Sequence, residues 1–512
     1  MRDAAAMPAV EADIVVVGGG GSGLAAAIEA ASFGRRVVLL EKHTRLGGTT
    51  GRSIGSVTAT NTPHQLRKGI LDSPDHHLED LNLFNAPLGA PDNEALKRIL
   101  VDNAPETFRW LMAMGLEFYG PMIELPHRKP RMHNVLPNSG AYIYHLERKA
   151  RSLGVEIHTS ARVTRLLTER RRVVGVVCET PNGVQMFRAR GVVVLACGDY
   201  SASVPFREKY ISPEMAAVQP INPTNTGDGH EMVLGLGGRV INGHLSLSGI
   251  RFQPPPSSWV AKIPPHRVIT RVMNLALERL PGWLLRPFIM SFLTTVLVPS
   301  PKLFRNGAVL INRNGERFTD ELEPLAGPLS RQPEQCAYIL LDGDLAQKFS
   351  TWPNYVSTAP GIAYAFLSDY RRSRRDVYHE ASTLTELANM IGVSSGALET
   401  SVRSVSAQSA SLSPNRAYAS FARGPYIALG PVRYFINFTD GGVAVNNRLQ
   451  VLGSGDAPVA GLYAAGLIGM GGVLLEGHGH HLGWAFTSGR LAGRNAAHDI
   501  VSADLPEAAR PA

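Results

Sequence analysis

A six-residue run near the C-terminus concentrates side chains that can move protons. It reads Glu476-Gly-His-Gly-His-His481 and holds one carboxyl group and three imidazoles. An imidazole with a pKa of about 6.5 can donate a hydrogen bond to an enolate oxygen or shuttle a proton at neutral pH. The close spacing of His478, His480 and His481 also suits metal ligation. An ordinary structural role is the third interpretation, and the run alone leaves all three open.

A cluster of glycines near the N-terminus has the spacing of a phosphate-binding turn. The run Gly18-Gly-Gly-Gly-Ser-Gly23 precedes an Ala-rich stretch, and Glu41 follows 23 residues after Gly18. In such a turn Gly18 bends the chain, Gly20 lets the backbone approach a pyrophosphate, and Gly23 lets the helix pack against the sheet. An acid at the position of Glu41 accepts hydrogen bonds from ribose hydroxyls. These residues predict a dinucleotide site.

The residues around these motifs predict the elements that position them. Apolar runs at 13–17 and 36–40 indicate buried parallel strands, and the stretch 24–33 between them indicates a helix. Further strands are expected at 155–158, 173–178, 185–190, 192–196 and 461–466, and helices at 384–390, 396–409 and about 482–499. Nucleotide-binding elements therefore lie at both ends of the chain. We expect a discontinuous nucleotide-binding domain, 10–243 and 425–505, with an inserted α+β capping domain, 244–424.

Composition excludes several classes of protein. Apolar residues make up 44% of the 512 residues, which excludes a disordered or fibrous chain. The formal net charge of +8 suits anionic ligands or membrane surfaces, but no basic run is interleaved with aromatics, so no nucleic-acid partner is expected. Three cysteines are too few for a disulfide framework. The lack of a secretory pattern and of about 18 consecutive apolar residues predicts a cytoplasmic protein without a spanning helix.

Six ordered motifs together resemble the FAD-binding flavoprotein family of fumarate reductases and 3-ketosteroid dehydrogenases. They are Gly18–Gly23 with Glu41-Lys42, Leu46-Gly-Gly-Thr-Thr-Gly51, Leu195-Ala-Cys-Gly198, Thr226-Gly-Asp-Gly229, Asn314-Gly-Glu-Arg-Phe318 and Gly461-Leu-Tyr-Ala-Ala-Gly466. The resemblance implies an α/β fold with a Rossmann-like FAD-binding domain of the glutathione-reductase type, split by the capping domain. It also implies a bound FAD that exchanges hydride through its N5 atom.

The resemblance also implies where the cofactor is held. The helix that begins near Leu482 would direct its N-terminal amides at the flavin and stabilise negative charge on its reduced form. Some relatives attach FAD through a His, but this chain reads Thr49-Thr-Gly-Arg-Ser-Ile54 at that place, so we expect non-covalent FAD. The expected cofactor-binding residues are Gly18, Gly20, Gly21, Ser22, Gly23, Glu41, Lys42, Gly47, Gly48, Thr49, Thr50, Gly51, Val163, Cys197, Gly198, Asp228, Gly466 and Leu482.

Two departures from the fumarate-reducing members bear on the substrate. Those members use two arginines that clamp or protonate a dicarboxylate. Here Arg331 arrives late in a differently spaced segment, and Glu476 takes the place of the second arginine, counted back from Arg490. An acid there repels a carboxylate, so both departures argue against a small dicarboxylate substrate.

The pattern of the ketosteroid dehydrogenases fits in part. In those enzymes a Tyr hydroxyl and a Gly amide polarise a ketone, and another Tyr removes the α proton. The same count places the Gly at Gly479 but the polarising Tyr at Leu475, so a nearby donor such as His478 must substitute. Because this loop faces flavin and substrate in the family, we expect active-site use of its histidines and no metal.

Candidates for the base are tyrosines and histidines. Tyr119 resembles a residue that lines the substrate cavity of relatives, His244 falls near a substrate-contacting His of the family, and Tyr364 lies in the cap. For these residues, as for His133 and Tyr434, a half-buried hydrogen-bonded ring is an equally good interpretation. The expected catalytic residues are Tyr119, His244, Tyr364, His478, Gly479 and His480.

The segment 254–301 is unusually apolar. Residues 266–280 place apolar side chains at helical spacing with three arginines on the polar side, and a mostly apolar run follows at 288–298. Three interpretations stay open: a lid over a lipophilic substrate, a monotopic membrane patch, and a helical hairpin buried against the cap or in a dimer.

The residues and the resemblance together predict an FAD-dependent dehydrogenase that introduces a C=C bond α,β to a cyclic ketone of the 3-ketosteroid or 4-oxocyclohexane type. Enoate reduction of the fumarate-reductase kind is the first alternative. A flavin-binding electron-transfer subunit without its own substrate is the second. The expected partners are a small apolar substrate and an electron acceptor, with peripheral membrane contact as one interpretation of the insert.

Overall fold

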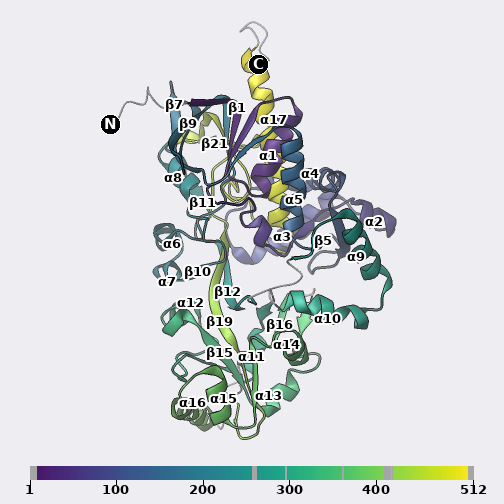
Figure 1. Cartoon of the computed structure of the whole chain (residues 1–512), viewed down its shortest axis with the longest axis vertical. Coiled ribbons are helices and arrows are strands. Elements are labelled where there is room, and N and C mark those ends of the chain that lie inside the picture. Colours follow the sequence, from purple (N-terminus) through teal and green to yellow (C-terminus); the bar gives the residue numbers. More distant parts are fainter. Residues whose placement is uncertain are drawn as a thin grey trace.

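The computed structural model describes residues 9–255, 262–294, 297–359, 363–408, 417 and 419–504. Figure 1 shows an elongated molecule with helices α1 (Gly21–Ser32) and α17 (His480–Asp504) at one end, and α15 (Leu384–Ile391) and α16 (Ser395–Gln408) at the other. Parts of the predicted insert 254–301, and the ends of the predicted segments 396–409 and 425–505, lie outside the described residues.

A parallel sheet forms the core of the first end. Its order is β21 (Gln450–Leu452), β22 (Pro458–Ala464), β9 (Gly183–Leu195), β1 (Ala9–Val17), β2 (Val37–Leu40) and β6 (Glu156–His158). All strand pairs from β22 to β6 are parallel. Because both faces of such a sheet are covered, its strands are continuous apolar runs rather than alternating ones. The predicted α/β class and Rossmann-like sheet are confirmed.

The strand β9 corrects one prediction. The segments 185–190 and 192–196 were expected as two strands, but they form one strand through Gly191. A Cβ on Gly191 would lie 2.2 Å from the side chain of Ile500, so this glycine lets α17 pack directly on the strand. The antiparallel pair β7 (Arg162–Glu169) and β8 (Arg172–Thr180) continues the sheet from β9.

Helices α1 and α17 pack closely against each other beside the sheet (Figure 1). Added Cβ atoms on Gly489 and Gly493 of α17 would each lie 2.3 Å from a carbonyl oxygen of α1, those of Ser22 and Ala26. Only glycine allows two helices to approach so closely at these positions. The predicted helix at 482–499 is confirmed and extends to Asp504.

A small antiparallel sheet beside α17 was not predicted. It consists of β3 (Ser56–Thr58), β5 (Met132–Leu136) and β4 (Glu117–Met122), in that order. Helices α3 (Pro74–Asn85), α4 (Glu94–Ala113) and α5 (Gly140–Ser152) complete this region.

The cap is built on a second sheet. Its strands are β10 (Gln219–Pro220), β19 (Tyr426–Thr439), β15 (Ala337–Leu341) and β14 (Val309–Ile311), with β12 (Ser246–Phe252) and β18 (Tyr378–Ala381) also paired to β19. One hydrophobic core contains residues from Ala12 to Val233 and from Val443 to Ile500, and the other contains residues from Ile250 to Val432. The chain therefore divides close to the predicted boundary at 243. Strand β19 runs through the other, at 424, because it belongs to the cap sheet.

The remaining elements are shorter. They are α2 (Pro63–Arg67), α6 (Val204–Tyr210), α7 (Pro213–Ala216), α8 (Asp228–Leu234), β11 (Val240–Ile241), α9 (Arg267–Arg279), α10 (Gly282–Leu293), β13 (Val298–Pro299), α11 (Pro301–Arg305), α12 (Ala326–Ser330), α13 (Gly343–Lys348), β16 (Ser357–Ala359), β17 (Ala363–Ala365), α14 (Leu367–Ser373) and β20 (Gly442–Val443).

The apolar insert forms two helices that bridge the two ends of the molecule. Helix α9 packs on β4 and β5, whereas α10 packs on α14 of the cap. The predicted helix at 266–280 is confirmed as α9, and much of the run 288–298 lies in α10. Among the described residues, no helix combines the length and apolar character needed to cross a membrane. The cytoplasmic location stays a prediction.

Replacement of Gly23 by Ala is expected to destabilise the fold. The added Cβ would lie 1.8 Å from the carbonyl oxygen of Gly18, so backbone would have to shift. Overpacking of this kind costs about 1–3 kcal/mol or more. Gly396→Ala is the matched control, because nothing lies within 4 Å of its added Cβ. Urea unfolding measures the difference, and equal stability of the two variants would contradict the packing argument.

Candidate active site

A cavity of about 1380 Å³ lies between the two cores and is lined by residues of both. This exceeds the roughly 300–1,000 Å³ of an ordinary ligand pocket, so the cavity has room for more than one small molecule. One half is formed by the glycine turn, α1 and the ends of the parallel strands. The other half is formed by the small sheet, the cap and the insert helices.

Glu41 organises the nucleotide half at the end of β2. Its two carboxylate oxygens accept hydrogen bonds from the backbone N–H of Gly19 (2.7 Å) and of His43 (2.8 Å). The carboxylate is buried yet lines the cavity, so its remaining lone pairs can accept from ribose hydroxyls.

The glycine turn leaves a bare floor in this half. A Cβ on Gly18 would lie 2.4 Å from the carbonyl oxygen of Ala196, whereas a Cβ on Gly20 would meet nothing closer than 3.9 Å. Gly20 therefore borders open cavity, and α1 begins there without a capping side chain. Free N-terminal amides beside a Cβ-free surface fit a pyrophosphate, so the residues present fit FAD.

The far end of this half is closed by an ion pair. Lys42 Nζ donates to Asp228 Oδ2 (2.7 Å) and to Thr226 Oγ1 (2.5 Å). Burial alone would raise the pKa of Asp228, but the hydrogen bond and charge of Lys42 outweigh it, so the pKa is lowered. Both ionised side chains line the cavity and can bind a polar ligand there.

A buried carboxylate that the sequence analysis missed positions the floor of the cavity. Asp199 accepts hydrogen bonds from Asn225 Nδ2 (2.6 Å) and from the backbone N–H of Thr439 (2.7 Å). Asn225 and Asn222 each donate to Thr49 Oγ1 at 3.0 Å. Since Thr49 accepts both bonds, its hydroxyl hydrogen remains available to a ligand in the cavity.

Most predicted cofactor-binding residues line this cavity. They are Gly18, Gly20, Gly21, Ser22, Glu41, Lys42, Gly48, Thr49, Thr50, Gly51, Val163, Cys197, Gly198, Asp228 and Leu482. Gly23, Gly47 and Gly466 do not line it and serve packing instead. Gly47 donates its N–H to the Gly19 carbonyl (3.0 Å), and a Cβ on Gly466 would lie 2.5 Å from Ser22 Oγ.

The other half contains a histidine held by a carboxylate. Glu124, in the loop between β4 and β5, accepts from His478 Nδ1 (2.6 Å) through one oxygen and from the His478 backbone N–H (3.0 Å) through the other. Because the carboxylate takes the Nδ1 proton, the tautomer is fixed and Nε2 is left for a ligand. His478 lines the cavity.

The loop that carries His478 is anchored from two further elements. Thr58 Oγ1 of β3 donates to the His478 carbonyl (2.6 Å), and Asn85 Oδ1 at the end of α3 accepts from the Glu476 N–H (3.1 Å). Gly479 has a φ of +92°, and a Cβ there would lie 2.7 Å from Thr58. The loop is therefore fixed before any ligand binds.

Two more ionisable groups of the predicted run lie in this half. His481 Nε2 donates to Asp440 Oδ1 at 2.7 Å. Burial raises the pKa of Glu476, and the charge of Asp440 adds to the effect while His481 opposes it. Glu476 lines the cavity, where a raised pKa favours the protonated acid over a carboxylate.

The walls around this polar corner are mostly apolar. They include Met122, Leu125, Met132, Leu247, Phe252, Met273, Leu277, Phe288, Ile289, Leu293, Phe435 and Phe438. Polar side chains interrupt them at Tyr119, Asn134, Ser248, Arg251 and Asn437. Arg251 and Arg52 are the arginines among the described lining residues, and Arg331 is exposed elsewhere on the cap.

Three of the predicted catalytic residues, Tyr119, His478 and Gly479, line the cavity, and three do not. His244 is exposed to solvent before β12. Tyr364 lies on β17, where its ring packs on Trp352 and Tyr355. Because none of the three outlying residues borders the cavity, we no longer assign catalytic roles to them.

His480, the third outlying residue, is fully buried in a cluster with His77 and His127. His480 Nδ1 donates to the Glu476 carbonyl (2.6 Å), so the 3.1 Å contact between the Nε2 atoms is a bond from His77 to His480. Burial lowers the pKa of His480 to about 4 and that of His127 to about 2, so the rings are neutral at pH 7.

The histidine cluster does not have the donor set of a metal site. Arg131 Nη1 donates to His127 Nδ1 at 2.8 Å, which forces the proton of this neutral ring onto Nε2. His127 therefore offers no lone pair towards the other two rings, and the buried guanidinium lies beside it. The absence of a metal stays our prediction, now for this trio instead of the sequence-adjacent one.

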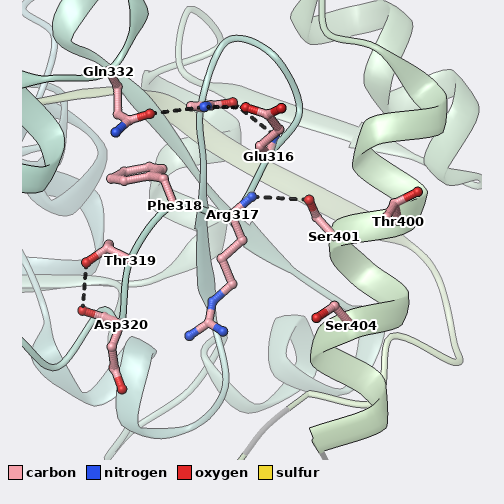
Figure 2. Close-up of a pocket in the computed structure, with 10 residues that line it drawn as sticks. Glu316, Arg317, Phe318, Thr319, Asp320, Gln332, Thr400, Ser401 and Ser404 are labelled. Atoms are coloured by element: carbon pink, nitrogen blue, oxygen red, sulfur yellow. Dashed lines mark hydrogen bonds between the residues drawn. The ribbon is translucent and has the colours of Figure 1, made fainter.

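A second, open pocket of about 760 Å³ lies in the cap around the motif 314–318. Figure 2 shows that its polar groups bond to one another. Asn312 donates to Gln332 (3.0 Å) and to Glu316 (3.2 Å), and the backbone N–H of Arg317 donates to Ser401 of α16 (3.1 Å). These bonds fasten the motif to α16, which is a structural role.

Asp199→Asn is expected to remove a pH-dependent part of the stability. Burial raises the pKa of Asp199 to about 6, from 3.8. The folded state therefore binds a proton that the unfolded state releases, and stability falls by roughly 3 kcal/mol as the pH rises from about 4 to about 6. Urea unfolding at both pH values should show this loss in the wild type and not in the variant. The exposed Asp344→Asn variant is the control, and parallel pH curves for all three proteins would contradict the assignment.

Gly20→Ala is expected to lose FAD affinity while the apoprotein keeps its stability. The backbone there has a φ of −81°, which Ala adopts freely, and the new Cβ points into open cavity. A methyl group in contact with the pyrophosphate should raise the dissociation constant at least about tenfold, or about 1.4 kcal/mol. Titration of apoprotein by flavin fluorescence measures this, with Gly396→Ala as control. Unchanged affinity would place the pyrophosphate elsewhere.

Comparisons with known proteins agree with this geometry. A model of the FAD binding domain matches residues 13–474. The urocanate reductase of Eggerthella lenta is 26% identical over 522 residues, which cover 95% of this chain and 75% of that protein. A probable fumarate reductase of Shewanella frigidimarina is 26% identical over 518 residues, covering 96% and 76%.

Solved structures share the fold. The open form of a flavocytochrome c3 fumarate reductase has a TM-score of 0.73 at 24% identity, covering 97% of this chain and 80% of that one. The 3-ketosteroid delta1-dehydrogenase of Sterolibacterium denitrificans has a TM-score of 0.63 at 20% identity, covering 95% and 99%. Since the family match spans residues 13–474, the chain belongs to the FAD binding domain family and is an FAD-dependent oxidoreductase of the fumarate reductase and ketosteroid dehydrogenase group.

Proposed function

We propose that this enzyme desaturates the carbon–carbon bond α,β to a ketone in a lipophilic cyclic substrate. The observation that carries the proposal is the composition of the substrate half of the cavity. One acid–base corner, at His478 and Glu124, is set into a wall of apolar side chains. A substrate that fits this wall is a largely hydrocarbon ring system with one polar group.

The charges in the cavity speak against a dicarboxylate. A dicarboxylate needs a cation at each end, and Arg251 is the arginine that lies among the cap residues of the lining. Glu476 occupies the same cavity, and its raised pKa reflects burial rather than a cationic partner. A neutral ketone avoids repulsion by this acid and can accept a hydrogen bond from it.

His478 is the base in this proposal. Glu124 holds the proton on Nδ1, so Nε2 is the atom that takes the α proton, and the carboxylate then stabilises the imidazolium. The hydroxyl of Tyr119 and the backbone N–H of Gly479 are donors that can polarise the ketone oxygen. When bound, FAD supplies the hydride acceptor.

Reduction of an enoate that carries one carboxylate is the second candidate. Arg251 favours it, because this guanidinium lines the cavity and burial lowers its pKa, which marks a largely desolvated cation. The two curated relatives described above are also named as reductases. A single carboxylate at Arg251 would still leave the apolar wall for the rest of the substrate.

Anaerobic mixing with saturated cyclic ketones tests the first candidate. A 3-ketosteroid should bleach the flavin absorbance of the wild type, and succinate should not. His478→Gln should slow bleaching by about 10²–10⁴-fold, because it removes the base, while flavin content stays unchanged. His76→Asn replaces an exposed histidine on α3 and should leave the rate unchanged.

A different pattern would favour the second candidate. If no cyclic ketone bleaches the flavin, but urocanate or another monocarboxylate enoate rapidly reoxidises the reduced enzyme, the desaturase proposal is wrong. In that case Arg251→Gln should raise KM for the enoate at least about tenfold, as expected from loss of a charge-assisted hydrogen bond.

A further inference from the structure

The insert helices α9 and α10 expose an unusual group of large apolar side chains. Six of them lie within 17 residues of sequence: Val268, Val272, Leu275, Leu280, Trp283 and Leu284, with exposed fractions from 44% to 76%. Contiguous exposed apolar patches on a protein surface mark binding sites. We call these six residues the α9–α10 apolar face.

Helix α9 is amphipathic in an unusual sense, because it is apolar on two opposite sides. Val268, Val272 and Leu275 are spaced four and three residues apart, so they share the solvent side of the helix. Met273 and Leu277 lie about half a turn away from them and line the cavity. A single helix therefore separates the lipophilic cavity from the exposed apolar face.

The apolar face is bordered by basic side chains. Residues 262–294 contain five basic residues, Lys262, Arg267, Arg271, Arg279 and Arg286, all exposed, against the single acid Glu278. Arg271 forms an ion pair with Glu117 (3.4 Å) and Arg286 with Asp369 (2.6 Å). The segment keeps an excess of positive charge, which complements an anionic surface.

Two exposed tryptophans lie on the same side of the cap. Trp283 of α10 is 76% exposed and Trp352 is 64% exposed. Trp352 contacts the ring of Tyr364, whose carbonyl accepts a hydrogen bond from Arg286 of α10, so it borders the apolar face. Tryptophan beside arginine is the pairing found at the boundary between lipid headgroups and acyl chains.

We propose that α9 and α10 dock in the interfacial layer of an anionic lipid bilayer. The apolar face enters the acyl boundary, and Arg267, Arg279 and Lys262 contact lipid phosphates. A second copy of the chain fits this surface less well, because a two-fold contact would bring two basic borders together. Resting on the function proposed above, the same docking lets a membrane-dissolved substrate reach the cavity past Met273 and Leu277.

Co-sedimentation of the FAD-loaded protein with lipid vesicles tests the docking. Vesicles of phosphatidylcholine with phosphatidylserine should bind the protein, those of phosphatidylcholine alone should bind it at least tenfold less, and added salt should weaken binding. The double variant Val272→Ser/Trp283→Ser should lose at least tenfold in partitioning. Arg267→Gln/Arg279→Gln should weaken binding and flatten its salt dependence.

The matched control removes exposed apolar residues elsewhere. Val184→Ser/Met390→Ser changes two side chains that are 45% and 53% exposed and lie outside the insert, so its partitioning should equal that of the wild type. Flavin content and melting temperature show that every variant is folded. Equal partitioning of the Val272/Trp283 variant and the wild type overturns the proposal. So does loss of a dimer in light scattering, in that variant, without any vesicle binding by the wild type.

Activity separates this proposal from the proposed function. The Val272→Ser/Trp283→Ser variant should oxidise a water-soluble cyclohexanone at the wild-type rate and should use a vesicle-borne steroid ketone less efficiently. Vesicle binding by a protein that oxidises no ketone would support docking and contradict the function. Ketone oxidation without vesicle binding would do the reverse.

Discussion

Close backbone approach between α1, α17 and the parallel sheet is the constraint on which the rest of the structure depends. Glycines at 23, 489 and 493 allow contacts that any side chain would block. This packing sets where both helices begin, and both begin at the cavity. The N-terminus of α1 is thereby aimed at the nucleotide half, and the loop before α17 delivers His478 and Gly479 to the substrate half.

The parts of the fold that could be predicted are those whose signals are local. The glycine turn, the apolar strands and the two ends of the nucleotide domain each carry a pattern within about 30 residues, and the fold family follows from their order. The partners of the site residues could not be predicted in this way. Glu124 lies 354 residues from His478, and Asp440 lies 41 from His481. Nothing in the loop between β4 and β5 marks Glu124 as a histidine partner before the sheet is folded.

The run 476–481 illustrates how spacing in sequence misleads. Its three histidines look like one cluster, but the left-handed glycines at 477 and 479 turn successive side chains in different directions. His478 bonds to Glu124, His481 bonds to Asp440, and His480 is buried against His77. Three similar residues thus acquire an acid–base, an electrostatic and a structural environment. Burial decides between these environments, because it keeps His480 neutral and removes it from the cavity.

The cap turns this differentiated loop into an enclosed site. Strand β19 extends from the cap sheet to Thr439 and Asp440, so the cap core holds the partner of His481 and the anchor of Asp199. Because one strand links both cores, the polar corner keeps its geometry while α9 and α10 cover it. Such a cover must have an apolar inner side to exclude water from the flavin. If its outer side were polar, an apolar substrate would have to cross water to enter. The outer apolar side of α9 removes that barrier where the protein meets lipid, and this joins the chemistry of the site to the surface of the molecule.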